Sequence, residues 1–564
     1  MQSEEKQANY KIKMAEKSDL ANTEQVDIPL ESHDDETSKL NDPSVPPEYQ
    51  SPKIDFNEGW KDRGFAIIFF LYLIAVMITS LVLGIPAIQS YAEHMKHHGK
   101  PTLFDINMTL LLHLFGGIIA TASLMSFIMF FFLQLCAGRM IIFSLVFIIL
   151  TQLGLCVFLV LIGLWPAAIV PLIVLLITVV FICMIKKRIK FADANIRIAC
   201  AVLRQHPSLL FIAIFVLILQ ILWFVICCLL ILGVLHAADR SVFDNFMNQL
   251  TKNSTGHAES TKYPWVVQTT STTTIIKRPY QYGINNVVQE DDNKNWHSKI
   301  VGYMIFFLVL FIWYWATMTF ANISHFISAC AVGHWWFPTD TNGQYQISHG
   351  VKRAFTTNLG TISFGSLLEA FVRDLRMCIG KNERGCITLC VQCILSIIEK
   401  IIGYINEWAF VYSALTGQSF IQAGKSFFKL LKQRGWTMII NDSLVGNCLG
   451  LVNFIVGITT AIITCVFCYF FFSTVSQKLV PTIVIAAFSS FFLGIILSLT
   501  VTTILKSCVR AAFVCFVLNP AALGATHPDH LQRLTEVWHE FYPNEFATSG
   551  YANLYPKAPS TNYV

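Results

Sequence analysis

The sequence predicts an all-α polytopic membrane protein with about ten transmembrane helices and a disordered N-terminal tail. Of its 564 residues, 54% are hydrophobic and only 13% are charged, whereas soluble proteins carry about 25% charged residues. The mean hydropathy is +0.56. Runs without Asp, Glu, Lys or Arg recur along the chain, and each is long enough for a span of about 20 residues. The net charge of +5 is a small remainder of 40 basic and 35 acidic residues, so we expect no nucleic-acid partner.

Residues 1–57 are polar and lack the periodic apolar residues of a packed core. We therefore expect a disordered cytoplasmic tail. Within it, Pro46-Pro47-Glu48-Tyr49 matches the PPxY pattern, in which a polyproline turn docks in an aromatic groove of a WW domain. We expect Pro46, Pro47 and Tyr49 to recruit a WW-domain ubiquitin ligase; the alternative is a proline-rich linker.

The next apolar runs predict five spans. Nothing before the first run resembles a cleavable signal, so we expect that run to stay in the membrane. The second span contains Gly116-Gly117-x-x-Ala120, a small-residue surface suited to close helix packing. The third and fourth share one uncharged run, which Gly163-Leu164-Trp165-Pro166 divides by a turn. The five predicted spans are 64–92, 107–136, the two halves of 140–185, and 209–236.

The basic run Lys186-Lys187-Arg188-Ile189-Lys190 sets the predicted orientation, because loops rich in Lys and Arg stay in the cytoplasm. Counting back through four spans places the N-terminus inside, and counting forward places 237–299 outside. This loop contains the sequon Asn253-Ser254-Thr255, so we expect a glycoprotein modified at Asn253. Both termini are expected in the cytoplasm of a plasma-membrane protein.

The sixth span, 300–338, carries no acidic residue, Lys or Arg and is rich in aromatic residues. At 100° per residue, Phe311, Trp315, Asn322 and His325 fall on one face. Ring faces beside polar groups in a spanning helix indicate a site for an organic cation. The alternative is that the rings pack against neighbouring spans or anchor the helix at the interface.

The stretch 353–415 predicts two amphipathic or only partly crossing helices, because charged residues interrupt it. Glu369 and Glu407 are its intramembrane carboxylates, and the alternative for both is a structural ion pair. We add Glu407 and Tyr412 to the candidate substrate-binding residues.

A basic helix follows, ending with Lys429, Lys432 and Arg434, and Asn441-Asp442 separates it from the next apolar run. The ninth and tenth spans are 443–477 and 479–505, and Arg510 marks the cytoplasmic end of the tenth. Together the spans make a transporter domain at 58–520, followed by a cytoplasmic tail at 521–564.

We expect neither an enzyme nor a cofactor, because the chain has no metalloprotease, nucleophile-elbow, P-loop or dinucleotide motif. Its 16 cysteines lie mostly in or beside apolar runs, which is typical of buried hydrophobic residues rather than disulfides. Metal sites at Cys386, Cys390 and Cys393, or at the histidines of 93–98, are possible alternatives; we expect none.

Several motifs resemble those of the choline transporter-like family, and the polar N-terminal tail resembles its fungal branch. They are Asn406-Glu407-Trp408-Ala409-Phe410, Ala414-Leu415-Thr416-Gly417-Gln418-Ser419-Phe420, Ala423-Gly424-Lys425, Asn441-Asp442-Ser443-Leu444-Val445-Gly446, Trp335-Trp336-Phe337, Asn519-Pro520 and His527-Pro528. The resemblance covers about residues 57 to 540 and implies a ten-span plasma-membrane transporter of choline or a related amine. Thr416-Gly417-Gln418 and Glu407 depart from the family pattern, which leaves the substrate open.

We therefore predict a transporter that moves choline or a similar small organic cation by alternating access. A negative membrane potential favours cation entry by about 2.3 kcal/mol per 100 mV, so the transport requires neither sodium nor ATP. The alternatives are a non-transporting scaffold that recruits a WW-domain ubiquitin ligase, and a channel.

Overall fold

The computed structural model describes residues 59–98, 108–164, 166–238, 288–337, 347–379, 386–472, 479–520 and 522–541, together with 543 and 546. Within these ranges the chain is helical and contains no strand. The predicted tail 1–57, with Pro46, Pro47 and Tyr49, lies outside the described residues, as does Asn253. The helices are α2 (Arg63–His98), α3 (Met108–Leu161), α4 (Ile169–Ile185), α5 (Ile189–Gln205), α6 (Ser208–Ala238), α8 (Val288–Trp336), α9 (Ile347–Phe355), α10 (Leu359–Ile379), α11 (Cys386–Thr416), α12 (Phe420–Phe472), α13 (Leu479–Leu518), α14 (Ala522–Thr526) and α15 (Pro528–Phe541).

Six helices in the described ranges are long and apolar enough to cross a membrane, or seven if α4 and α5 form one bent span. One of them, Gly116–Leu161 within α3, has 46 residues. Such a helix is about 69 Å long, more than twice the bilayer core of about 30 Å. Its backbone leaves the helical region at Cys136 (φ −129°, ψ 30°), where the second predicted span ends, so α3 comprises two membrane-length segments. Counting both, with α2, α4, α6, α8 and α10 to α13, the architecture agrees with the predicted ten helices.

Two predicted boundaries have different outcomes. The turn between the third and fourth spans is confirmed, and its Gly163 adopts a positive φ of 80° that favours glycine. The boundary at Asn441-Asp442 is wrong, because α12 continues without a break from Phe420 to Phe472. A polar pair beside an apolar run is typical of a helix end, whereas Asp442 is instead a buried ion-pair partner within the helix.

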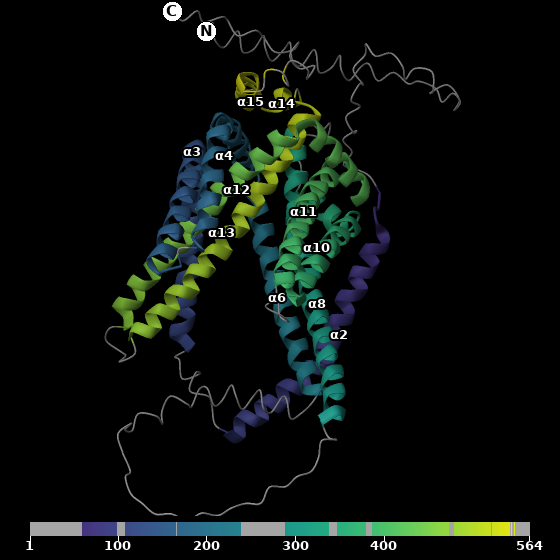
Figure 1. Cartoon of the computed structure of the whole chain (residues 1–564). Helices are drawn as coiled ribbons and strands as arrows, with labels where there is room; N and C mark the ends of the chain where they lie inside the picture. The colour runs from purple at the N-terminus through teal and green to yellow at the C-terminus, as the bar shows by residue number, and fades with distance from the viewer. Residues whose placement is uncertain are drawn as a thin grey trace, which may run out of the picture.

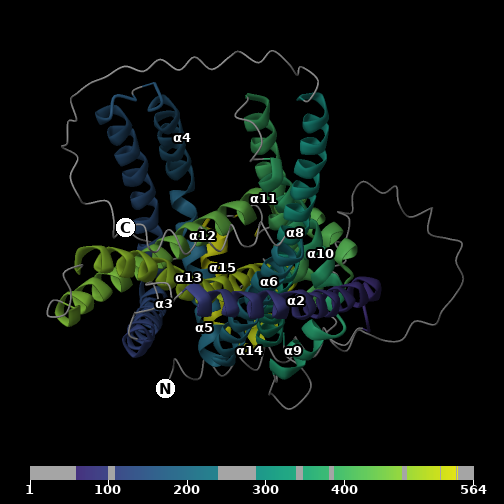
Figure 2. The ribbon, with the colours of Figure 1, turned by 90° about the horizontal axis from the view of Figure 1, so that it is seen from below.

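The long helices form two groups that lie side by side (Figures 1 and 2). The first group contains α3, α4, α12 and α13, in which α12 and α13 pack along each other. The second contains α2, α6, α8, α10 and α11. Contacts of α13 with α8 and of α11 with α12 join the two groups. The short helices α14 and α15 cover one end of the bundle.

The core is concentrated at this covered end. In α13, Leu505 and the segment from Ser507 to Phe516 are buried, whereas Ile485 and Phe488, nearer the other end of the helix, are 69% and 66% exposed. The same gradient occurs in α8, where Ile323 to Val332 is almost entirely buried and Met304 is 67% exposed. One end of the bundle is therefore closed by tight packing, and the other presents apolar side chains.

Glycines allow α2 and α6 to cross closely. A Cβ atom on Gly233 would lie 2.6 Å from the backbone carbonyl carbon of Leu83 and 2.8 Å from the backbone nitrogen of Gly84. Close approach through small residues is a common way to pack membrane helices. The small-residue surface predicted at Gly116 and Gly117 is not used in this way, because a Cβ at either position would meet nothing within 4 Å.

The start of α2 is fastened to two later helices through Asp62. Its Oδ2 accepts hydrogen bonds from Thr361 Oγ1 at 2.8 Å and from the backbone N–H of Phe420 at 2.9 Å. The backbone N–H of Lys61 donates to Thr357 O at 3.0 Å. This arrangement satisfies an otherwise orphaned donor at the beginning of α12.

We expect Gly233→Ala to destabilise the protein by about 1–3 kcal/mol, because the added methyl group would overlap the α2 backbone and force the helices apart. Thermal unfolding of the purified protein measures this. Gly154→Ala is the matched control, since Gly154 is also helical and its Cβ would meet nothing within 4 Å. Equal stability of the two variants would contradict the close crossing.

Candidate functional site

The predicted aromatic residues of α8 lie in a packed cluster. Trp315 is 5% exposed, and its Nε1 donates a hydrogen bond to Ser363 O of α10 at 3.0 Å. Its ring lies 4.5 Å from that of Tyr72, 5.4 Å from Phe69 and 6.0 Å from Phe311, measured between centroids. The face of Trp315 is thus covered by α2 in this conformation.

The polar residues of the same α8 face lie further along the helix. Asn322 Nδ2 donates to Ser366 Oγ of α10 at 2.9 Å. His325 is buried, and its backbone oxygen accepts a hydrogen bond from Ser507 Oγ of α13 at 2.8 Å. Its imidazole lies close enough to Glu407 for electrostatic interaction. The structure therefore brings the rings of Phe311 and Trp315 together, whereas His325 and Glu407 lie within electrostatic range of each other.

The remaining predicted residue, Tyr412, is fully buried on α11. Three cavities within the described ranges, beside Cys136, Cys156 and Gly117, are lined by other residues. Of the predicted substrate-binding residues, Trp315, Asn322, His325 and Tyr412 are buried in this conformation.

The most highly charged part of the core surrounds Arg510 of α13. Its side chain is only 2% exposed. Asp442 of α12 holds it in a bidentate pair, with Oδ1 2.7 Å from Nε and Oδ2 2.9 Å from Nη2. Its Nη1 forms an ion pair with Glu407 of α11. Because an unpaired buried charge is strongly destabilising, these contacts fasten three helices together.

Two aromatic faces complete the environment of Arg510. The guanidinium carbon lies 5.8 Å from the ring centroid of Tyr404 and 5.7 Å from that of Trp408, both on α11. These distances are within the range of cation–π attraction. We call Tyr404, Glu407, Trp408, Asp442 and Arg510 the cation box, because four of them surround the charge of the fifth.

The charges of the cation box do not cancel by themselves. Glu407 and Asp442 contribute two negative charges against the one positive charge of Arg510, which leaves −1. Lys506 Nζ lies 3.8 Å from Glu407, one turn before Arg510, and its positive charge brings the sum to zero. Two ring faces and two carboxylates around a cation are the chemistry that recognises an organic ammonium group.

Four residues of the cation box are absent from the predicted site residues. Tyr404, Glu407 and Trp408 have the spacing i, i+3, i+4 and so share one face of α11. This spacing is visible in the sequence and could have placed Tyr404 and Trp408 beside Glu407. Arg510, by contrast, stands in the sequence where a basic residue is expected at the end of a span, and no pattern in the sequence connects it with Asp442.

A second ion network lies between α10 and α11. Arg373 contacts Glu369 at 3.4 Å and Glu399 at 2.7 Å, and Arg376 contacts Glu399 at 2.6 Å. Ion pairing, the alternative considered for Glu369 and Glu407, therefore occurs at both residues. At Glu407 it occurs in an environment that also contains aromatic faces.

Comparison with known proteins identifies the family. Protein PNS1 of Gibberella zeae is 28% identical over 251 residues, which cover 43% of this chain and 46% of that protein. Protein PNS1 of Cryptococcus neoformans is 25% identical over 412 residues, covering 69% and 65%. Protein PNS1 of Yarrowia lipolytica is 22% identical over 538 residues, covering 88% and 83%. In the first two relatives the match spans less than two thirds of their length.

Residues 169–521 match the family described as plasma-membrane choline transporter, and this range is more than half of the chain. The match contains every helix that contributes to the cation box. The resemblance found in the sequence motifs is confirmed. The chain belongs to the choline transporter-like family, in its fungal branch.

Proposed function

We propose that this protein moves choline or a related small organic cation across the plasma membrane by alternating access. The observation that carries the proposal is the buried guanidinium of Arg510, which lies between two ring faces and two carboxylates. A quaternary ammonium group has no N–H to donate, so ring faces and negative potential are the means of holding it. Membership of the family supports the same conclusion.

Arg510 occupies the cation box in this conformation. A substrate that uses Glu407 and Trp408 must therefore exchange with the guanidinium, or share the carboxylates with it. This exchange makes substrate binding depend on the relative position of α11 and α13, since Arg510 comes from α13 and the two ring faces come from α11. Binding and helix movement are coupled in this way.

We further propose that the cation path runs along the α8 face, from Phe311 and Trp315 past Asn322 to His325 and the cation box. Tyr412 lies one turn beyond Trp408 on α11 and would continue the path. Transport sites commonly lie between helices near the middle of the bilayer. The covered aromatic cluster at Trp315 would then have to open during the transport cycle.

For the orientation, we propose that both termini are cytoplasmic and that 237–299 faces outside. The covered end of the bundle gathers α5, which follows the basic run at 186–190, together with α14 and α15. Basic segments beside spans favour the cytoplasmic side. The packed core at this end corresponds to a closed cytoplasmic gate.

Two other functions are distinguishable by experiment. The motif Pro46-Pro47-Glu48-Tyr49 favours a scaffold that recruits a WW-domain ubiquitin ligase. If the protein is a scaffold, deletion of the tail alone abolishes its cellular effect. If it is a carrier, the purified protein gives saturable uptake in liposomes. A channel would give current that does not saturate.

We expect Glu407→Gln to weaken the apparent affinity for choline, because it removes one of the two carboxylates at nearly constant volume. Each 1.4 kcal/mol of lost attraction raises KM about tenfold. Uptake of labelled choline by protein in liposomes, normalised to the amount of folded protein, measures this effect.

Glu399→Gln is the matched control, since Glu399 is also an ion-paired carboxylate of α11 but lies outside the cation box. A KM that stays unchanged in Glu407→Gln, with folded protein reduced equally in both variants, would assign Glu407 to structure alone.

For Trp315, we expect Trp315→Phe to keep part of the uptake and Trp315→Leu to raise KM, since leucine is apolar but has no ring face. Trp313→Leu is the control on the same helix, off the predicted face. If Trp315→Leu changes only the amount of folded protein, its role is packing against Phe69 and Tyr72.

A test of orientation uses Asn253. In cells that add N-linked glycans, Asn253→Gln should remove a glycosidase-sensitive shift in gel mobility, because only a loop outside the cytoplasm is modified. Glycosylation of a sequon engineered beside Lys425 would instead reverse the assigned topology.

A further inference from the structure

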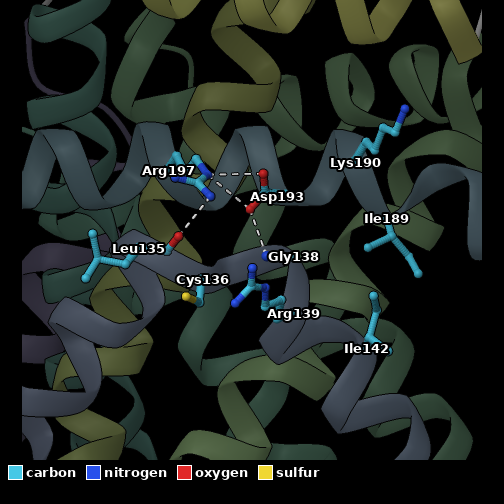
Figure 3. Close-up of a pocket in the computed structure, with 9 residues that line it drawn as sticks. All are labelled: Leu135, Cys136, Gly138, Arg139, Ile142, Ile189, Lys190, Asp193 and Arg197. Atoms are coloured by element: carbon cyan, nitrogen blue, oxygen red, sulfur yellow. Dashed lines mark hydrogen bonds and ion pairs between the residues drawn. The ribbon is translucent and has the colours of Figure 1, made fainter.

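A cavity of about 360 Å³ lies beside the interruption of α3 at Cys136, between α3 and the start of α5 (Figure 3). Its walls come from residues 135–142 and 189–197. We call it the break pocket. It contains no residue of the cation box and none of the predicted substrate-binding residues, so the proposed transport function does not account for it.

Two residues of α5 hold the broken helix together. The backbone N–H of Gly138, just after the break, donates to Asp193 Oδ1 at 2.8 Å. Arg197 Nη1 and Nη2 donate to the carbonyl oxygens of Gln134 and Leu135, just before it, both at 3.1 Å. Figure 3 shows the bond of Arg197 to Leu135 before the break and the bond of Gly138 to Asp193 after it. Asp193 and Arg197 therefore satisfy backbone groups that the interruption would leave unpaired.

The break pocket keeps an excess of positive charge. Arg139, Lys190 and Arg197 line it with Asp193 as the one acidic residue, so three positive charges face one negative charge and leave +2. From α15, Arg533 contacts Asp193 at 3.5 Å and Glu540 contacts Lys190 at 2.9 Å. These two residues add opposite charges, so the six residues Arg139, Lys190, Asp193, Arg197, Arg533 and Glu540 together carry +2.

Arg139 and Lys190 are the groups that a ligand can engage. Arg139 is exposed, and its side chain makes no hydrogen bond or ion pair within the described ranges. Lys190 and Glu540 form a pair in which the side chains are 64% and 52% exposed. Such exposed pairs contribute only about 0–1 kcal/mol, so a stronger anion can replace Glu540.

The break pocket also borders apolar surface. Leu135 and Ile142, on its α3 wall, are 70% and 51% exposed. The axis of α5 is bent 79° from that of α4, so α5 lies across the spans when α4 crosses the bilayer. Basic side chains next to exposed apolar side chains, at the end of a span, match the level where lipid headgroups meet acyl chains.

We propose that the break pocket binds the phosphate-bearing headgroup of an anionic membrane lipid. The guanidinium of Arg139 and the ammonium of Lys190 contact the phosphate, and an acyl chain lies along Leu135 and Ile142. Arginine suits this role because its planar fork matches phosphate oxygens. A bound lipid bridges α3 and α5 at the break.

The test measures binding of a fluorescent short-chain phosphatidylinositol 4-phosphate to the purified full-length protein. We expect Arg139→Gln to weaken binding about fivefold, and Arg139→Gln with Lys190→Gln to weaken it about 25-fold, on the basis of about 1 kcal/mol per basic residue. Arg139→Lys should bind more tightly than Arg139→Gln but less tightly than the unaltered protein, because it keeps the charge and loses the planar fork. Thermal unfolding of each variant should match that of the unaltered protein, because neither residue holds the break.

Arg204→Gln is the matched control, since Arg204 is an exposed basic residue of α5 that does not line the break pocket. An equal loss in this variant would overturn the proposal in favour of diffuse attraction to basic surface. Inositol 1,4-bisphosphate and inorganic phosphate form the soluble arm. If either soluble compound binds as tightly as the lipid and displaces it, the site takes a free phosphate instead.

Discussion

A guanidinium group buried among membrane helices must keep counter-charges beside it, and this requirement determines how the covered end of the bundle is built. Arg510 obtains them from two different helices, α11 and α12. The free-energy cost of leaving it unpaired is several kcal/mol. The relative positions of α11, α12 and α13 are therefore tied to one charge, and a rearrangement of these helices must exchange that charge for another cation or carry it along.

The distribution of burial is consistent with this constraint. Around the cation box the helices are tightly packed, and Trp408 stacks on Phe427 with an interplanar angle of 22°. Toward the other end, α12 and α13 retain contacts with each other while many of their apolar side chains are exposed. Packing that is strong at one end and weaker at the other favours movement about the packed end, because fewer contacts resist displacement elsewhere.

The sequence predicted the fold class and most helices, because long uncharged runs with basic flanking residues are typical of membrane spans and rare in soluble domains. It also predicted which residues of α8 share a face. It did not predict the cation box, because partners such as Asp442 and Arg510 are 68 positions apart and helix pairing is not encoded in local periodicity. Local sequence alone favours a helix boundary at Asp442 and a cytoplasmic flank at Arg510. The sequence predicts close helix packing at the wrong glycines for a similar reason. Gly116-Gly117 forms a local motif, whereas Gly84 and Gly233 lie on two separate helices.

Because α12 is unbroken, a small tilt near one end of it displaces the other end by a larger distance. Asp442 lies near the packed end of the bundle. The helix ends 30 residues later, at Phe472, which is about 45 Å away at 1.5 Å per residue. A tilt of about 10° around Asp442 moves the far end by about 8 Å over that length. Asp442, the point about which this tilt is measured, is one of the carboxylates that hold Arg510. A small change in the direction of α12 at the cation box would therefore produce a much larger displacement at the opposite end of the helix.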